Sequence, residues 1–226
     1  MLASIGTISS SYQPGLLSGI IAYWKLDESS GTLFNSVQAS INMTANNTPT
    51  YGTTGIINTA LSFAALSSEY LDSAHNADFN SSSYTISAWV KRASITTTQM
   101  IFAHDDTGVG YAFYFGADNK IRLVHQLVLD VGSDGTITDT SGFHHVAIVY
   151  NGSVAAFYID GAASGAPSIG AFNNATTTET IACNKNIVPQ LFFDGVIDEV
   201  GVWSRTLRQG EITELYNSGA GLSYPF

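Results

Sequence analysis

The length and charge of this chain limit both its architecture and its partners. The chain has 226 residues, of which 45% are apolar and only 12% are charged, and its net charge is −10. This length accommodates one large all-β domain, and so few charges leave a surface rich in Ser, Thr, Asn and Gly. A negative charge repels phosphate backbones and anionic lipid surfaces, so we expect neither a nucleic-acid nor a membrane partner.

The first 18 residues show no sustained alternation of apolar and polar side chains. Their apolar stretch is interrupted by Pro14 and Gly15 and lacks a basic segment before it, so it does not resemble a signal peptide. We interpret residues 1–18 as an arm and residues 19–226 as one domain. The single cysteine, Cys183, cannot form an intramolecular disulfide, and we expect it to be a small buried side chain.

After the arm, short runs of alternating apolar and polar residues predict many antiparallel strands. The connections between them are too short for crossover helices, so we expect two packed antiparallel sheets in a jelly-roll sandwich. One short helix is predicted near the C-terminus, where Ile212, Leu215 and Tyr216 have helical spacing and Gly219 would end it. The strand-like runs are "IIAYWKL", "ALSFAA", "YTISAWVKR", "QMIFAHD", "YAFYFG", "KIRLVHQ", "FHHVAIVY", "AAFYID" and "FFDGVIDEVGVW".

Five longer motifs follow one another between roughly residues 20 and 220. They are "AYWKLDESSGT", "NTALSFAALSSEYLD", "YTISAWVKR", "FHHVAIVYNGSVAAFYIDGA" and "FDGVIDEVGVWSRTLRQGEITELYNSG". In this order they resemble the successive motifs of laminin-G-like domains of the concanavalin A-like lectin/glucanase superfamily. The resemblance implies a concanavalin A-like jelly roll of two curved sheets, frequently with a structural calcium and often with a carbohydrate- or protein-binding face. Because this fold carries lectins, glycosidases and structural domains, it does not specify function.

The chain departs from the family pattern at the start of the predicted helix. A Ser or Thr usually caps this helix in the family, whereas here Leu207 is followed by Arg208, Gln209 and Gly210. We therefore expect the helix to start late or to fray.

Two adjacent pairs of carboxylates, Asp27–Glu28 and Asp198–Glu199, are the candidates for acid–base chemistry. Adjacent residues of a strand point to opposite faces, so neither pair can act on one substrate unless a bulge intervenes. The resembling glucanases carry three carboxylates alternating along one strand face. Here Val196 and Val200 flank Asp198 at those positions, so we expect no catalytic residue.

Asp27 and Asp198 are instead candidate ligands of a metal ion. Asp27 precedes a Ser-Ser-Gly turn and Asp198 lies on a strand that such folds place near the N-terminal one. The matching segments of laminin-G-like relatives often hold Ca²⁺, a cation that prefers oxygen ligands. In the alternative interpretation, Asp27 caps the turn through backbone N–H groups and Asp198 makes a polar contact near the end of the sandwich. The sequence leaves both open.

Trp89 is a candidate for binding a ligand. In "YTISAWVKR", Ile86, Ala88 and Val90 form an apolar face, while Trp89 shares the other face with polar residues. An aromatic ring among hydroxyls is typical of a platform on which sugars stack. The alternative is that this face lies beneath another segment.

His144 and His145 lie on one predicted strand with no cysteine or third histidine nearby. This spacing is a poor metal set. We interpret the pair as contributing a core histidine.

Three hypotheses of function follow. The first is a non-catalytic virion or particle-surface protein, in a capsid decoration or a tail, whose jelly roll binds glycans and whose arm contacts other virion proteins. The ends "MLASIGTISSSY" and "ELYNSGAGLSYPF" resemble those of laminin-G-like structural proteins in bacteriophage genomes. The second is a cellular or secreted, extracellular carbohydrate-binding module. The third, a glycoside hydrolase, lacks the required triad. A homo-oligomer is compatible with the first two.

Overall fold

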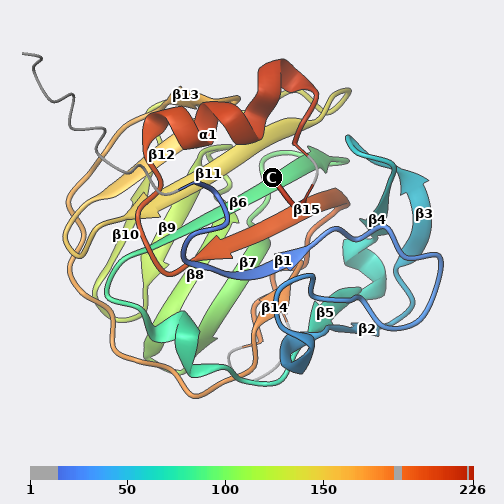
Figure 1. The fold of residues 1–226 in the computed structure, drawn as a ribbon, viewed down its shortest axis with the longest axis horizontal. Helices are drawn as coiled ribbons and strands as arrows, with labels where there is room; N and C mark the ends of the chain where they lie inside the picture. Colours follow the sequence, from blue (N-terminus) through green and yellow to red (C-terminus); the bar gives the residue numbers. More distant parts are fainter. Residues whose placement is uncertain (1–14, 186–189, 223) are drawn as a thin grey trace, which may run out of the picture.

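Two antiparallel sheets packed face to face form the protein (Figure 1). The computed structural model describes residues 15–185, 190–222 and 224–226. This arrangement confirms the all-β sandwich with one short C-terminal helix that the alternating pattern predicts. No helix in the described residues is both long and apolar enough to span a membrane.

The first sheet carries the outer face on which the C-terminal helix lies. Its longest strands, β6 and β15, pair with each other at its centre. Within the described residues its order is β13 (Ala162–Ala163), β12 (Ala155–Ile159), β11 (His144–Tyr150), β6 (Tyr84–Arg92), β15 (Gly195–Trp203), β4 (Thr59–Phe63) and β3 (Thr50–Thr54), with β1 (Ile20–Trp24) also paired to β15.

The second sheet closes the other side of the core. Its strands are shorter at one end, where β14 pairs with only two residues of each neighbour. Within the described residues its order is β10 (Leu129–Gly132), β9 (Ile121–His125), β8 (Val109–Phe115), β7 (Gln99–Asp106), β14 (Thr180–Ile181), β5 (Tyr70–Asp72) and β2 (Thr44–Asn46).

The main core lies between the two sheets, and period-two alternation decides which side chains enter it. On β6, Ile86, Ala88 and Val90 point into this core, as the sequence pattern predicts. Cys183 is also fully buried there, and burial raises the pKa of its thiol to about 12, so it is an unreactive packing residue.

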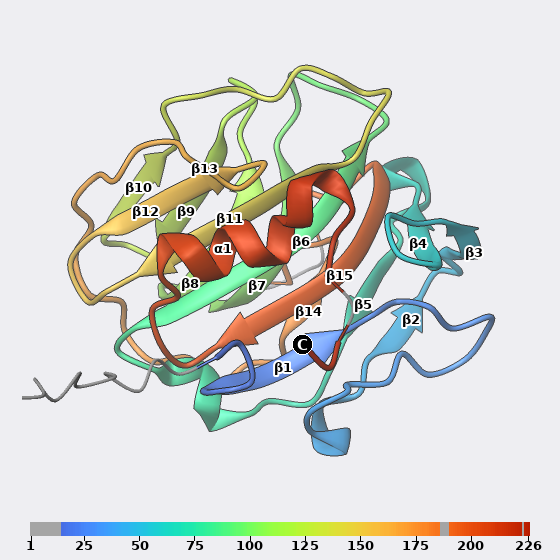
Figure 2. The same cartoon turned by 45° about the horizontal axis from the view of Figure 1, so that its top comes forward.

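A second apolar cluster lies on the outer face of the first sheet, beneath helix α1 (Gln209–Tyr216). Figure 2 shows α1 lying across β11 and β6. Ile212 and Leu215 from the helix pack with Ala147 and Val149 of β11 and with Trp203 of β15. The outer face of this sheet is therefore a covered layer.

The helix begins at Gln209, without the late start expected from its missing Ser or Thr cap. The carboxylate of Glu211 accepts the backbone N–H of Arg208 at 2.9 Å and also pairs with Arg205 at 2.6 Å, which replaces the usual cap. The helix ends at Tyr216, because Asn217, two residues before the predicted stop at Gly219, adopts the left-handed conformation with φ of 46°.

Most of the predicted arm, residues 1–14, lies outside the described residues. The last four residues of the arm, 15–18, belong to the folded body. Leu16 is buried in the cluster under α1, and its carbonyl accepts the indole N–H of Trp203 at 2.7 Å. Arg205 donates to the carbonyls of Gly15 and Ser18.

Candidate functional site

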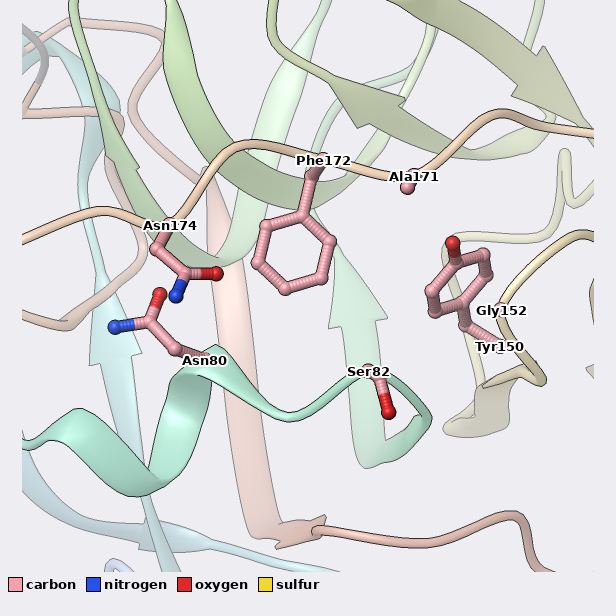
Figure 3. Close-up of a pocket in the computed structure, with 7 residues that line it drawn as sticks. All are labelled: Asn80, Ser82, Tyr150, Gly152, Ala171, Phe172 and Asn174. Carbon is pink, nitrogen blue, oxygen red and sulfur yellow. The ribbon is translucent and has the colours of Figure 1, made fainter.

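A pocket of about 350 Å³ opens at the end of the sandwich where β6 begins and β11 ends. Three segments far apart in sequence build it: the residues before β6, the end of β11 with its turn, and the loop before β14. Figure 3 shows the ring of Phe172 between a pair of asparagines and Tyr150. Its lining residues are Asn80, Ser82, Tyr150, Gly152, Ala171, Phe172 and Asn174.

Phe172 closes an aromatic cluster at this end of the core. Its ring meets those of Tyr111, His125 and Tyr84 at 5.0, 5.3 and 5.9 Å, each nearly edge to face. The cluster supports the half-exposed ring from behind, so the ring keeps one orientation toward the pocket. A fixed aromatic surface suits the apolar face of a ligand.

His125 inside this cluster is held neutral. Its Nδ1–H donates to the carbonyl of Gly170 at 2.6 Å, and its Nε2 accepts the hydroxyl of Tyr84 at 2.8 Å. Burial lowers the pKa of His125, in keeping with an uncharged ring. The aromatic cluster behind Phe172 is therefore uncharged at this histidine.

Polar groups line the rest of the pocket. The amide of Asn80 is occupied, because it exchanges two hydrogen bonds with the backbone of Ala175. Ser82 and Asn174 are exposed at the rim. None of the described lining residues carries a charge. An aromatic ring flanked by a hydroxyl and amides is suited to a neutral, hydroxyl-rich ligand.

The predicted metal ligands Asp27 and Asp198 hold one turn from two sides. Asp27 Oδ1 accepts the backbone N–H of Thr59 at 3.1 Å, and Asp198 Oδ2 accepts those of Ile56 and Ile57 at 2.8 and 3.2 Å. The close approach leaves no room for a side chain at Gly55, where a Cβ would lie 2.5 Å from Asp198 Oδ2. Asp198 thus makes a polar contact, as the alternative interpretation describes, whereas Asp27 holds this turn and not the Ser-Ser-Gly turn that follows it in sequence.

A β-bulge in β15 changes the faces of the sheet to which its adjacent residues point. The pairing of β15 with β6 slips between Asp198 and Gly201, and Glu199 has a left-handed φ of 49°. Ile197 and Val200 both point into the main core, so the two residues between them lie on the outer side. The structure therefore contains the bulge that the sequence-based expectation names as its exception, and Asp198 and Glu199 lie on the same side of the sheet.

The bulge buries two carboxyls with unused oxygens. Asp198 is 0% and Glu199 3% exposed. Asp198 Oδ1 and both oxygens of Glu199 make no hydrogen bond of ordinary geometry to a described residue, although Tyr23 lies close to Glu199. Burial raises the pKa of Asp198 to about 7 and that of Glu199 to about 8, and neighbouring Asp27 adds to both shifts.

These unused oxygens fit a cation better than they fit catalysis. A hard cation would satisfy the oxygens and their charge, with Asp198 and Glu199 as the carboxylate ligands and Asp27 in a supporting position. Asp27 has only a supporting position because its two oxygens already accept hydrogen bonds, one from Asn58 and one from Thr59. A polysaccharide cannot reach two carboxyls that are almost fully buried.

Trp89 is 3% exposed beneath α1. Its ring lies 5.7 Å from that of Tyr216, in a stacked arrangement, and 5.2 Å from that of His145. The structure places it as the covered alternative describes, because the helix occupies the face on which a sugar would stack.

His144 and His145 differ in environment, as strand alternation requires. His145 is fully buried beside Trp89, its Nε2 lies 2.8 Å from the hydroxyl of Ser87, and burial lowers its pKa to about 4. Nδ1 of His144 lies 2.7 Å from Asp160, which raises the pKa of this histidine. His145 is thus the packing histidine that the sequence predicts.

The sequence pattern does not identify the pocket, and it marks Glu199 only as a candidate for acid–base chemistry and not as a ligand of a cation. The pocket residues lie in loops, where no periodic pattern marks them. Only the high content of Asn and Ser before β6 and before β14 hints at a polar rim.

Solved structures with the same fold come from several carbohydrate-active and toxin proteins. Domain 4 of a GH43 extracellular arabinanase from Geobacillus stearothermophilus, in complex with arabinotriose, matches with a TM-score of 0.64 and 17% identity over 86% of this chain and 97% of that one. The binding domain of Paraclostridial Mosquitocidal Protein 1 matches with a TM-score of 0.68 and 14% identity. A sialidase of Trypanosoma rangeli matches with a TM-score of 0.62 and 12% identity.

This chain matches only part of the length of the last two structures. This chain spans 89% of its own length but 52% of the mosquitocidal chain, and 91% of its own length but 34% of the sialidase. Identities this low establish a shared fold. A comparison with curated proteins finds no match.

A family model supplies the family itself. The Laminin G 3 model, described as the concanavalin A-like lectin/glucanases superfamily, matches residues 66–213. This range contains β6 with Trp89, the pocket segments and the bulge of β15. Since the match covers more than half of the chain, this protein belongs to the laminin G family of the concanavalin A-like lectin/glucanases superfamily.

Proposed function

We propose that this protein is a non-catalytic glycan-binding module displayed on the surface of a virion or a similar particle. The observation that carries the glycan part is the pocket of Figure 3, where an ordered aromatic ring faces exposed amide and hydroxyl groups. Sugars present both an apolar ring face and hydroxyls, so they complement this lining. The arabinotriose complex of the arabinanase domain, which has the same fold, supports the choice of ligand class.

The ligand is proposed to be a neutral sugar. The net charge of −10 repels anionic glycans at long range. No basic side chain among the described lining residues offsets that repulsion. Arabinotriose is therefore a suitable neutral probe, and sialyllactose is the matching anionic one.

We expect arabinotriose or another neutral oligosaccharide to bind the parent protein, and Phe172→Ala to weaken that binding about tenfold. Removing the ring deletes a stacking contact on the order of 1 kcal/mol together with its apolar contact area. Isothermal titration calorimetry measures both affinities. Phe34→Ala is the matched control, because Phe34 is 60% exposed and does not line the pocket.

The same titration tests the absence of catalysis. The oligosaccharide recovered afterwards should be intact by chromatography, because the two buried carboxyls of β15 are out of reach of a substrate. An unchanged affinity of Phe172→Ala, or stronger binding of sialyllactose than of every neutral sugar, would contradict the proposal. Cleaved products would favour the hydrolase hypothesis.

The particle part of the proposal is supported by exposed apolar side chains on one hairpin. Leu127, Val128 and Leu129 at the turn between β9 and β10 are 89%, 42% and 48% exposed. Such a cluster, on a surface otherwise poor in charge, suits contact with another protein. The arm is the second proposed contact, through residues 1–14, because residues 15–18 pack within the folded body.

Antibodies against this chain should therefore label purified particles from cells that produce it. Leu129→Ser should lower the amount of chain on those particles, because it removes apolar contact area without touching the core. Leu66→Ser is the matched control, since Leu66 is fully exposed on the 3-10 helix Ala65–Ser67. If the parent chain is recovered only in the free protein fraction, the proposal that it lies on a particle is wrong. The proposal that it binds a glycan is not affected by that result.

A further inference from the structure

His75, His104 and Glu179 converge beside the second sheet, although they come from three separate segments. Their ligand atoms all lie within 4.8 Å of one another, and no other such group of three occurs among the described residues. Nδ1 of His104 lies 3.1 Å, and Nδ1 of His75 3.8 Å, from the same oxygen, Glu179 Oε1. His104 and Glu179 are fully buried, whereas the side chain of His75 is 30% exposed.

The tautomer of His104 is decided by Asn80. The amide of Asn80 is oriented by Ala175, because its Oδ1 accepts the backbone N–H and its Nδ2 donates to the carbonyl. Nε2 of His104 lies 3.1 Å from that same Oδ1, so Nε2 carries a hydrogen. Nδ1 therefore faces Glu179, the geometry in which a metal-binding histidine is held by its other ring nitrogen.

Glu179 is oriented in the same way. Its Oε2 accepts the hydroxyl of Ser73 at 2.9 Å, and its Oε1 lies 3.3 Å from the backbone N–H of Asn76. These contacts turn Oε1 toward the two histidines. Supporting hydrogen bonds of this kind distinguish a built metal site from a chance cluster.

His75 completes the group from the exposed side. Its ring stacks on that of His104 at 5.8 Å with an angle of 13° between the planes. Its Nδ1 lies 3.0 Å from the carbonyl of Thr177, and this nitrogen carries a hydrogen when no metal is bound. His75 can release that hydrogen by moving it to Nε2, which requires no net loss of charge.

We propose that His75, His104 and Glu179 bind Zn²⁺. Two imidazole nitrogens and one carboxylate oxygen form a donor set that Zn²⁺ accepts readily and that Ca²⁺ and Mg²⁺, which prefer oxygen alone, do not. Three protein ligands also leave one position of a tetrahedral ion open to water on the His75 side. This site is separate from the carboxyls of β15.

The ion would also join the segments that form the pocket. His75 precedes the 3-10 helix Ala77–Asn80, and Glu179 follows the loop that contains Phe172 and Asn174. His104 lies on β7 between them. A bound ion would therefore connect the segment before β6 and the loop before β14, which both line the pocket, to strand β7.

Untagged protein, stripped with chelator, should bind one Zn²⁺ per chain by calorimetry. At a hundredfold excess of Zn²⁺ over its dissociation constant, the melting temperature should rise by about 5 to 10 °C. The Asp198→Asn variant lacks one carboxylate of the other candidate cation site. In this variant, Ca²⁺ and Mg²⁺ at the same concentrations should not raise the melting temperature as Zn²⁺ does.

His75→Ala is the decisive variant, because His75 is partly exposed and its loss leaves the buried pair in place. It should melt near the parent in chelator and lose most of the zinc-dependent rise. His144→Ala is the matched control, since His144 is also partly exposed but lies on the first sheet. It should keep the zinc response in full.

Nitrogen NMR of the parent gives a second readout that does not depend on a variant. Zn²⁺ should shift the Nδ1 resonances of His75 and His104 and leave His125 and His145 unchanged. An equal zinc response in His75→Ala and the parent, or no response in the parent, would overturn the site.

Discussion

The parent protein is expected to lose stability in chelator as the pH rises from about 4 to about 8, and to regain part of it in calcium. The folded-state pKa values of Asp198 and Glu199, about 7 and about 8, lie above their ordinary values of 3.8 and 4.5. Groups with raised folded pKa values stabilise the fold fully below their unfolded pKa. That stability is lost as the pH rises through 7 and 8.

The loss in chelator should be several kcal/mol and at most about 9 kcal/mol, because the two pKa values together lie about 7 pH units above their ordinary values and each pH unit corresponds to about 1.4 kcal/mol. We propose that Ca²⁺ is the cation that replaces these protons in the native protein. At a hundredfold excess over its dissociation constant, Ca²⁺ should add about 2.7 kcal/mol. Its effect should be large at pH 8 and small at pH 5, where protons already neutralise the carboxyls. Thermal melts across this pH range measure both the loss of stability in chelator and the gain in calcium.

Asp198→Asn separates the cation from the turn contacts. The amide oxygen can still accept the N–H groups of Ile56 and Ile57, while the negative charge is gone. In chelator at pH 8 the variant should melt at a higher temperature than the parent. In calcium its melting temperature should no longer exceed that of the parent. A turn-holding role alone predicts the same difference in both buffers.

Asp105→Asn is the matched control for this experiment. Asp105 is buried on the other sheet, one of its oxygens has no hydrogen-bond partner among the described residues, and burial raises its pKa to about 6. Its substitution should change the pH dependence equally with and without calcium. If the parent melts at the same temperature in chelator and in calcium at pH 8, the calcium proposal is wrong.

Trp89→Ala is expected to lower the free energy of unfolding by about 3 to 5 kcal/mol without weakening glycan binding by the folded protein. The substitution leaves a cavity between Tyr216 of the helix and His145 of β11. It also removes the surface on which that end of α1 rests. Urea denaturation measures the stability, and titration with the oligosaccharide measures the affinity of the folded fraction.

Phe34→Ala again provides the control, because truncating a ring that is 60% exposed should change stability by less than about 0.5 kcal/mol. The informative alternative is a Trp89→Ala protein with near-parent stability and no sugar binding. That result would show that the helix moves aside in solution and that Trp89 is a stacking platform.

On β6, the sequence pattern predicts the strand and its two faces but not what covers them. The alternation of "YTISAWVKR" predicts a strand with Ile86, Ala88 and Val90 on one face, and these three residues enter the main core. It also places Trp89 on the opposite face. It does not say what covers that face, because the covering helix is formed by residues more than a hundred positions later.

The carboxyls of β15 show the opposite case. Alternation predicts that Asp198 and Glu199 diverge, yet a left-handed Glu199 places both on one side of the sheet. Glutamate carries no local signal for this conformation, which is uncommon for any residue other than glycine. The bulge follows from pairing with β6 and β1, so it depends on neighbours that the local pattern does not contain.

The sequence alone therefore determined the elements of this protein: its alternating strands, its apolar faces and its family. These depend on the spacing of side chains within a few residues, which the chain carries wherever it is placed. Tertiary structure alone decided the pocket, the cluster of His75, His104 and Glu179, and the pairing of unused oxygens on β15. Each of these joins segments far apart in sequence, and their meeting depends on the order of strands in the sheets and on the paths of the loops between them.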